Sequence, residues 1–356
     1  MRLKVLSAID SFKGCLTSAE ANEAAAKGLK ETCPDADVEC YTVSDGGEGF
    51  LEAMQPDEIV TCHVHDALMR GCDAAFGIKN GKAIIEVAKA IGLTMVEPEN
   101  RNPLVATSYG VGELVAHALR RGCKEFIIGL GGVATSDCGL GMLKALKREW
   151  QTQANKLWYE PFDTAWLRKI KLTLATDVKN PLYGPDGAAH VFAPQKGADA
   201  DMIEKLDRRA KTFAAMAAKH QGRDCANAPG AGAAGGLGYA FMEFMDAKVE
   251  SGADLVLQAS GFDEALNASE KPQFVVTGEG SADAQTLMGK LPSIILKHCK
   301  AMDIPVILVA GHIKDRDQLL EAGFEKVIDI NAGLEMGHAM DKDVASQRIE
   351  NAMHLK

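Results

Sequence analysis

The chain has 356 residues, 47% of them hydrophobic and 25% charged, which is the composition of a soluble globular protein. This length favours two domains, and the formal net charge of −10 argues against a nucleic-acid partner. The nine cysteines are scattered and form no CxxC pair, so we expect a cytoplasmic protein with reduced thiols. No apolar run approaches the ~20 residues of a membrane span, so we expect no membrane partner.

The first predicted unit is a strand, a polar glycine loop and a helix. Residues 3–9 form a β-branched, apolar run that ends at the segment 10–14, and Thr17 or Ser18 can cap the helix that follows. Lys13 lies where it could reach a phosphate group, although a solvated loop lysine explains it equally well.

A second strand over residues 38–43 ends at a loop, residues 44–49, that contains three glycines together with Asp45 and Glu48. From residue 59 to about 87 the pattern changes to short alternating stretches, which predict antiparallel strands with a hairpin turn at Asn80-Gly81. We therefore place a domain boundary near residue 58.

Arg70 and Arg101 lie in or just after this antiparallel region. Either guanidinium group could hold a carboxylate with two parallel hydrogen bonds. Most arginines are surface residues, however, so neither is a strong candidate by itself.

The third strand, glycine loop and helix begins with a strand over residues 126–130 and continues with Gly131, Gly132 and Asp137. Backbone N–H groups at such a helix start favour phosphate. A further strand over residues 172–175 ends at Asp177.

A GxGxxG pattern occurs at Gly230, Gly232 and Gly235. A dinucleotide site would require a strand before it, but the preceding sequence GRDCANA is polar and typical of turns. We therefore favour close helix packing or an anion-binding loop over a nicotinamide site.

The segment 273–292 carries the densest set of polar groups. Its apolar run, residues 274–276, predicts a buried strand that stops at the glycine-rich residues 277–280, before Asp283, Lys290 and a helix. An acid, an amide, a hydroxyl and a lysine are the groups that phosphoryl transfer requires, although an ordinary β–α loop is an equally good explanation for this segment alone.

Several strand ends thus carry glycines beside an acid or a lysine, which predicts an α/β enzyme that binds an anionic ligand at the carboxyl ends of its strands. The sequence contains neither the GxxxxGK[ST] motif nor the protein-kinase motifs, so a phosphotransferase of another design remains.

The chain resembles the type-1 glycerate kinase family over nearly its whole length. The motifs that carry the resemblance are DSFKG (10–14), SDGGEG (44–49), RNPL with TSYGVGEL (101–114), GLGGVATSD (129–137), ATDVKNPLYGPDGAA (175–189), FAPQKGA (192–198), PGAGAAGGLG (229–238) and TGEGSADAQTLMGKLP (277–292).

The resemblance implies phosphorylation of D-glycerate by ATP with Mg²⁺, usually at the 2-position, with an active site in a cleft between two α/β domains. One domain would be flavodoxin-like, with a parallel sheet built from both chain ends, residues 1–58 and 261–356. The other, residues 59–260, would be an inserted mixed α/β domain. The oligomeric state is left open.

We expect direct in-line transfer, in which positioning and charge neutralisation do most of the work. Asp283 or Asp177 would accept the hydroxyl proton. Mg²⁺ would be held by Asp45, Glu48 and Asp137, phosphate charge would be neutralised by Lys13 and Lys290, backbone N–H groups would come from Gly131, Gly132 and Gly280, and the substrate would be bound by Ser11 and by Arg70 or Arg101.

Some positions depart from the family pattern. Ser281 stands where the family usually has Arg, Cys15 where it has Ser, and Met69 where it has Gly. These departures leave two alternatives open, a kinase for another small hydroxy acid and an inactive relative that binds a ligand without turnover.

Overall fold

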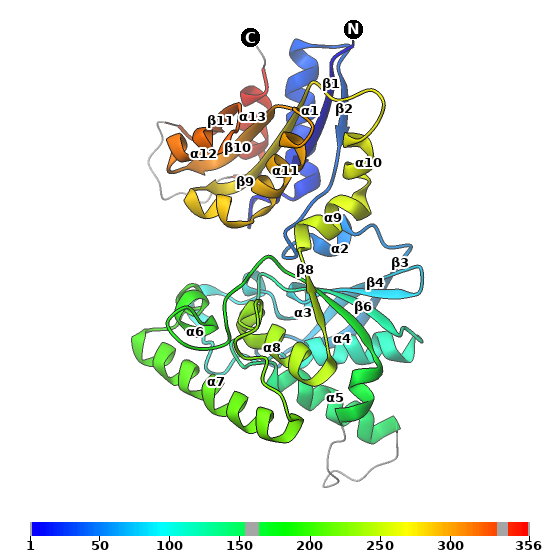
Figure 1. Ribbon diagram of the computed structural model, residues 1–356, viewed down its shortest axis with the longest axis vertical. Coiled ribbons are helices and arrows are strands. Elements are labelled where there is room, and N and C mark those ends of the chain that lie inside the picture. The colour runs from blue at the N-terminus through cyan, green and yellow to red at the C-terminus, as the bar shows by residue number, and fades with distance from the viewer. Residues whose placement is uncertain (1, 154–163, 333–340, 355–356) are drawn as a thin grey trace. The chain divides into compact units, whose positions relative to one another are not determined.

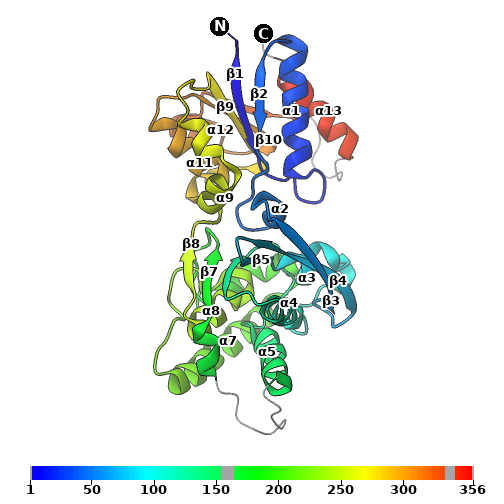
Figure 2. The ribbon, with the colours of Figure 1, turned by 90° about the vertical axis from the view of Figure 1, so that its right-hand side faces the viewer.

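The computed structural model describes residues 2–153, 164–332 and 341–354, and the chain divides into two units (Figures 1 and 2). Unit 1 contains Met1–Gln55 and Ala253–Lys356, and unit 2 contains Pro56–Gly252. The boundary expected at residue 58 falls on the first residue of strand β3, and the one expected at residue 260 falls on the last residue of helix α9.

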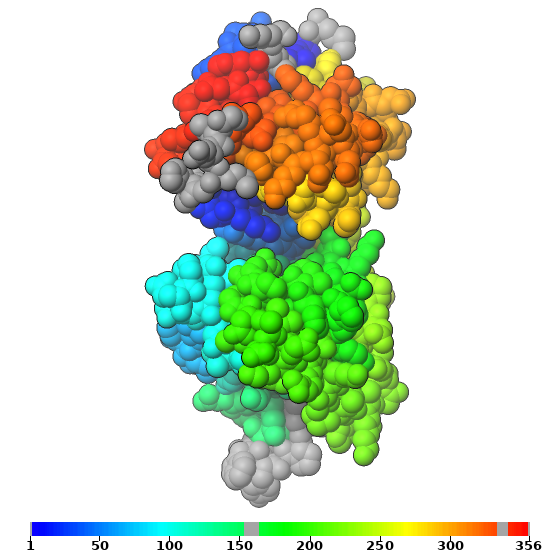
Figure 3. All heavy atoms as spheres, turned by 90° about the vertical axis from the view of Figure 1, so that its left-hand side faces the viewer, coloured from blue at the N-terminus to red at the C-terminus, as the bar shows by residue number. Residues whose placement is uncertain are grey.

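Unit 1 is built from both ends of the chain, as the blue and red atoms gathered in Figure 3 show. Its elements are β1 (Lys4–Ile9), α1 (Ser18–Thr32), β2 (Asp37–Cys40), α2 (Phe50–Ala53), α9 (Gly252–Ser260), α10 (Phe262–Leu266), β9 (Phe274–Ala282), the 3-10 helix η5 (Ala284–Met288), α11 (Leu291–Lys300), β10 (Val306–Ile313), α12 (Arg316–Ala322), β11 (Lys326–Asp329) and α13 (Lys342–Ala352).

The sheet of unit 1 has the order β11-β10-β9-β1-β2, and every neighbouring pair in it is parallel. Helices α1 and α13 pack side by side on one face of this sheet, and α11 and α12 cover the other (Figure 2). Because parallel strands with helices on both faces are apolar throughout, β1 and β9 contribute fully buried residues such as Val5, Ile9 and Val276.

Unit 2 has a mixed sheet with its own core. Its elements are β3 (Glu58–His65), β4 (Gly71–Lys79), β5 (Lys82–Glu86), α3 (Ala88–Ile91), η1 (Leu93–Met95), η2 (Pro98–Asn100), α4 (Tyr109–Arg120), β6 (Glu125–Gly129), α5 (Leu140–Gln153), η3 (Thr164–Lys169), β7 (Lys171–Ala175), α6 (Ala188–Phe192), η4 (Pro194–Lys196), α7 (Ala200–Gln221), α8 (Ala233–Met245) and β8 (Lys248–Glu250).

The sheet of unit 2 has the order β3-β4-β5-β6-β7-β8. Strands β3, β4 and β5 are antiparallel neighbours, and β5 to β8 are parallel. The hairpin predicted at Asn80-Gly81 is confirmed, because both residues have positive φ angles and join β4 to β5. The predicted fold class, a parallel sheet from both chain ends with an inserted mixed α/β domain, is therefore correct.

One local prediction was wrong. Strand β9 does not stop at the glycine-rich residues 277–280 but continues to Ala282, because β10 extends with it and Ser281 pairs with His312. Gly278 permits this close pairing, since a Cβ atom there would overlap the carbonyl oxygen of Val309. Glu279 consequently lies on a strand and not in a mobile turn.

The helices offer no candidate for a membrane span: within the described ranges, none is both long and apolar enough to cross a bilayer.

Substitution of Gly28 by Ala should destabilise unit 1 by about 1–3 kcal/mol, because a Cβ atom there would overlap the backbone carbonyl of Glu350 and push α13 from α1. Urea unfolding would measure the change, with Glu23→Ala on the exposed side of α1 as a control that should stay within about 0.5 kcal/mol. A stabilised Gly28→Ala variant, as helix propensity alone would predict, would contradict this packing.

Candidate active site

The candidate residues of unit 1 gather where the strand order of its sheet reverses. From β1 the chain adds β2 on one side, and β9 then lies on the other side of β1. Parallel sheets bind ligands at the carboxyl ends of the strands that flank such a switch point. The segment 10–14 follows β1 directly, and a Cβ atom on Gly280 of β9 would lie 3.6 Å from the Cα atom of Phe12 and 3.8 Å from the nitrogen of Lys13.

Asp10 is buried at this switch point, and its carboxylate accepts a 2.7 Å hydrogen bond from the backbone N–H of Ser11. Burial, followed by the charge of Asp45, raises the pKa of the Asp10 carboxyl well above its ordinary value. The nearby ammonium group of Lys13 opposes that rise. The pKa of Lys13 is itself raised, first by Asp45 and then by Asp10, Glu279 and Glu48 against the effect of burial.

A second lysine–carboxylate pair completes this group. Lys290 lies 3.1 Å from one carboxylate oxygen of Glu279, and the hydroxyl of Thr286 donates a 2.6 Å hydrogen bond to the other. Burial nevertheless raises the pKa of Glu279, and Asp45 adds to the rise. We call Asp10, Lys13, Asp45, Glu48, Glu279 and Lys290 the switch-point cluster.

Two further predicted residues lie near this cluster. Asp283 caps η5, and its carboxylate accepts a 2.8 Å hydrogen bond from the N–H of Gln285. Ser11 is buried, and among the described residues its hydroxyl has no hydrogen-bond partner. Such an uncompensated buried hydroxyl usually indicates a missing water, ion or ligand.

In unit 2, the predicted phosphate-binding glycines follow strand β6. Gly132 has a φ of 65° and its carbonyl accepts a hydrogen bond from the N–H of Leu93. In the described ranges the N–H groups of Gly131 and Gly132 have no acceptor, so both can donate to an anion.

Asp137 ends this loop, and its carboxylate accepts several hydrogen bonds from within the protein. Its Oδ2 atom accepts hydrogen bonds from the backbone and the hydroxyl of Ser108, both at 2.9 Å, and from the N–H of Gly141 at 3.0 Å, and its Oδ1 atom accepts from Gly139. Because the carboxylate already has donors on both oxygens, this geometry favours a cap of α5 over a metal ligand.

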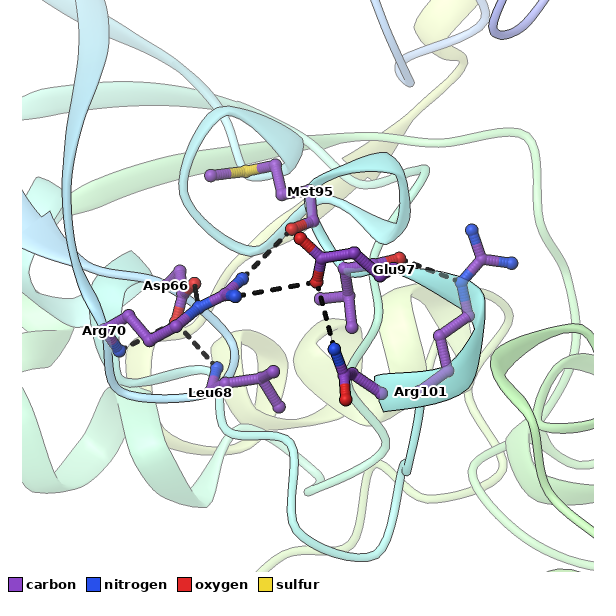
Figure 4. Close-up of polar contacts among 8 residues, drawn as sticks. Asp66, Leu68, Arg70, Met95, Glu97 and Arg101 are labelled. Carbon is purple, nitrogen blue, oxygen red and sulfur yellow. Dashed lines mark hydrogen bonds and ion pairs between the residues drawn. The ribbon is translucent and has the colours of Figure 1, made fainter.

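The two candidate arginines differ in how far their guanidinium groups are already hydrogen-bonded within the protein (Figure 4). The guanidinium of Arg70 contacts Asp66 at 2.6 Å, the carbonyl of Met95 at 3.1 Å and Glu97 at 3.6 Å. Arg101 donates from Nε to the carbonyl of Val96, and its guanidinium turns away from the Arg70 network. Within the described part of the chain the two terminal nitrogens of Arg101 have no partner, so Arg101 is better placed to bind a carboxylate.

The GxGxxG segment packs against the Gly131–Cys138 loop. No strand leads into it, since turns occupy the residues that precede α8. A Cβ atom on Gly235 would overlap the carbonyl of Thr135, and one on Gly236 would lie 2.9 Å from the Cα atom of Cys138. The glycines therefore serve close packing, as the sequence analysis favoured, and a nicotinamide site has no support. Asp177 follows β7 at the same edge of the sheet.

Sequence reasoning assigned no role to Asp10, Glu279 or Lys196. Lys196 is only 3% exposed and donates a 2.6 Å hydrogen bond to the carbonyl of Thr135. Burial lowers the pKa of Lys196 to about 8, against the attraction of Asp137. All three residues lie inside the motifs DSFKG, TGEG and FAPQKGA, but burial and charge contacts, which mark them as unusual, are properties of the folded chain.

Replacement of Asp10 by Asn should stabilise the ligand-free protein at neutral pH. Because the folded state raises the pKa of this carboxyl, ionisation disfavours folding as the pH rises from the ordinary Asp pKa through the raised one. The gain in melting temperature over the parent chain should therefore be present at pH 7 and vanish below about pH 3, where the carboxyl is protonated in both states. Asp35→Asn in an exposed turn is the control, and a less stable Asp10→Asn protein at pH 7 would refute the argument.

Comparisons with known proteins identify the family of this chain. The glycerate kinase family model matches residues 5–354. A glycerate kinase of Bacillus subtilis is 39% identical over 351 residues, which cover 93% of this chain and 91% of the relative, and a glycerate 2-kinase of Escherichia coli is 38% identical, covering 88% and 86%. A crystal structure of a glycerate kinase 2 from Salmonella typhimurium LT2 has a TM-score of 0.74 at 33% identity, covering 99% of this chain and 96% of that one. The chain therefore belongs to the glycerate kinase family.

Proposed function

We propose that this enzyme transfers the γ-phosphoryl group of Mg·ATP to the 2-hydroxyl of D-glycerate and thereby forms 2-phosphoglycerate. Family membership supports the reaction class, and the switch-point cluster is the observation that supports phosphate chemistry. It places two lysines among buried and half-buried carboxylates at the strand ends where α/β proteins bind anions. We also propose a cytoplasmic location, in keeping with nine cysteines that are all thiols.

The carboxylates of unit 1 are the best candidates for holding Mg²⁺. Asp45 and Glu48 remain the candidates expected from the sequence. We add Asp10 and Glu279, because their carboxylates interact electrostatically with the same cluster. In the described part of the chain no three His, Cys, Asp or Glu side chains are arranged as a metal site. That is compatible with Mg²⁺, which keeps several waters and binds through one or two carboxylates together with the phosphates of its nucleotide.

Lys13 and Lys290 would neutralise charge on the transferred phosphoryl group, and the N–H groups of Gly131, Gly132 and Gly280 would bind phosphate oxygens. Lys290 pairs with Glu279 and Lys13 lies in the field of Asp45 and Asp10, so an incoming phosphate competes with those carboxylates unless Mg²⁺ neutralises them. The cluster thus favours nucleotide and metal bound together over nucleotide alone.

Arg101 would bind the carboxylate of the acceptor, with Arg70 as the alternative, and Ser11 would contact the substrate through its unpaired hydroxyl. Asp283 or Asp177 would accept the proton of the attacking hydroxyl. In-line transfer needs little more than these positioned charges.

Purified protein should release ADP from Mg·ATP in the presence of D-glycerate, and phosphorus NMR should show the product substituted at the 2-position. Omission of Mg²⁺ should abolish turnover. Because Ser281 replaces a usual Arg, a panel of small hydroxy acids belongs in the same assay. Turnover with another acid alone would replace glycerate as the acceptor, and ligand binding without any turnover would identify an inactive relative.

The general base should emerge from a comparison of Asp283→Asn with Asp177→Asn. Loss of the base should lower kcat by about 10²–10⁴-fold with an unchanged melting temperature, whereas the other variant should lose far less. Asp303→Asn, an exposed carboxylate of unit 1, is the matched control. If both variants keep a near-normal kcat, neither residue is the base.

A further inference from the structure

Lys196 has an environment that its structural contacts do not explain. It belongs to η4, and its ammonium group is buried against the carbonyl of Thr135 at 2.6 Å. An ammonium group has three donors, and in the described part of the chain this one has a single hydrogen-bond acceptor. A buried charge normally requires a partner charge and further hydrogen bonds.

The loop above Lys196 presents unpaired hydroxyls as well. Thr135 is fully buried and Ser136 is 8% exposed. The hydroxyl oxygens of both are shielded from solvent and lack a hydrogen-bond partner in the described ranges. The loop whose backbone receives the Lys196 ammonium group thus carries two unpaired hydroxyl donors, and unpaired donors of this kind suit an oxyanion.

The 3-10 helix that carries Lys196 packs against the backbone of Arg101. A Cβ atom on Gly197 would lie 2.8 Å from the carbonyl oxygen of Arg101 and 3.2 Å from its Cβ atom, so η4 lies directly against the segment of Arg101. Asp137, the acid whose charge acts on Lys196, already accepts hydrogen bonds from Ser108, Gly139 and Gly141. An anion arriving here would meet unpaired donors beside a carboxylate that is already hydrogen-bonded within the protein.

We propose that Lys196, together with the hydroxyl groups of Thr135 and Ser136, binds an oxyanion of a substrate of this enzyme, either the carboxylate of the acceptor or a phosphate of the nucleotide. The proposal rests on the proposed function for the identity of that substrate. Because the hydroxyl oxygens are covered, binding requires a small shift of the loop, which the glycines at 131, 132 and 139 permit.

Ser136→Ala is the decisive variant, because it removes a hydroxyl that has no partner in the protein. Its melting temperature should equal or exceed that of the parent chain, while its dissociation constant for one substrate should rise about tenfold. A merely structural hydroxyl would give the reverse, lower stability with unchanged affinity. Thr135→Val should behave in the same way.

Lys196→Met should weaken binding of the same substrate about a hundredfold, since it removes a charged donor. Lys205→Met, which replaces an exposed lysine on α7, is the matched control and should leave binding unchanged. Titration calorimetry with D-glycerate in one arm and Mg·ADP in the other would distinguish the two sources of the oxyanion. A higher dissociation constant for D-glycerate alone identifies the oxyanion as the carboxylate, and a higher dissociation constant for Mg·ADP alone identifies it as a phosphate.

These binding measurements separate the inference from the proposed function. If the parent chain turns over D-glycerate but Ser136→Ala, Thr135→Val and Lys196→Met bind both ligands as the parent chain does, the oxyanion site is wrong and the kinase assignment stands. If the parent chain binds one ligand without turnover and the variants lose that binding, the oxyanion site stands and the kinase assignment falls. Absence of binding to the parent chain in both arms overturns the oxyanion site.

Discussion

The charge balance at the carboxyl ends of β1 and β9 is the constraint on which the candidate site of unit 1 depends. Burial and the neighbouring charge of Asp45 raise the pKa values of the Asp10 and Glu279 carboxyls, and Lys13 and Lys290 offset only part of that rise. A fold that only needed stability would not bury carboxylates in this way. The arrangement makes sense where cations bind, and it trades stability of the ligand-free protein for readiness to bind them.

Strands and hydrogen bonds hold the charged residues of this cluster. Glu279 lies on a strand that pairs with β1 and β10 on its two sides, and its carboxylate is held by Thr286 and Lys290. Asp10 follows β1 without an intervening loop. Sites built on strands hold their groups more exactly than sites built on long loops, which suits a reaction that depends mainly on positioning.

In unit 2, close packing at small residues holds the candidate residues in place. The Gly131–Cys138 loop, the segment before α8 and η4 approach one another so closely that Gly235 and Gly197 have no room for a side chain. This packing buries Lys196 and the hydroxyls of Thr135 and Ser136, and it leaves the N–H groups of Gly131 and Gly132 available. Close packing at glycine thus shapes the part of unit 2 for which we propose anion binding.

Much of the molecule could be predicted without a structure, because periodicity and glycine placement are local. The strand–loop–helix units, the hairpin at Asn80-Gly81 and the family motifs all follow from residues that are close in sequence. What only the tertiary structure decided is which groups meet across long sequence separations. It brings Glu279 beside Asp10, commits Asp137 to capping α5, engages Arg70 with Asp66 and Glu97, and buries Lys196 under Thr135. Burial and through-space charge set these roles, and neither can be derived from the order of residues along the chain.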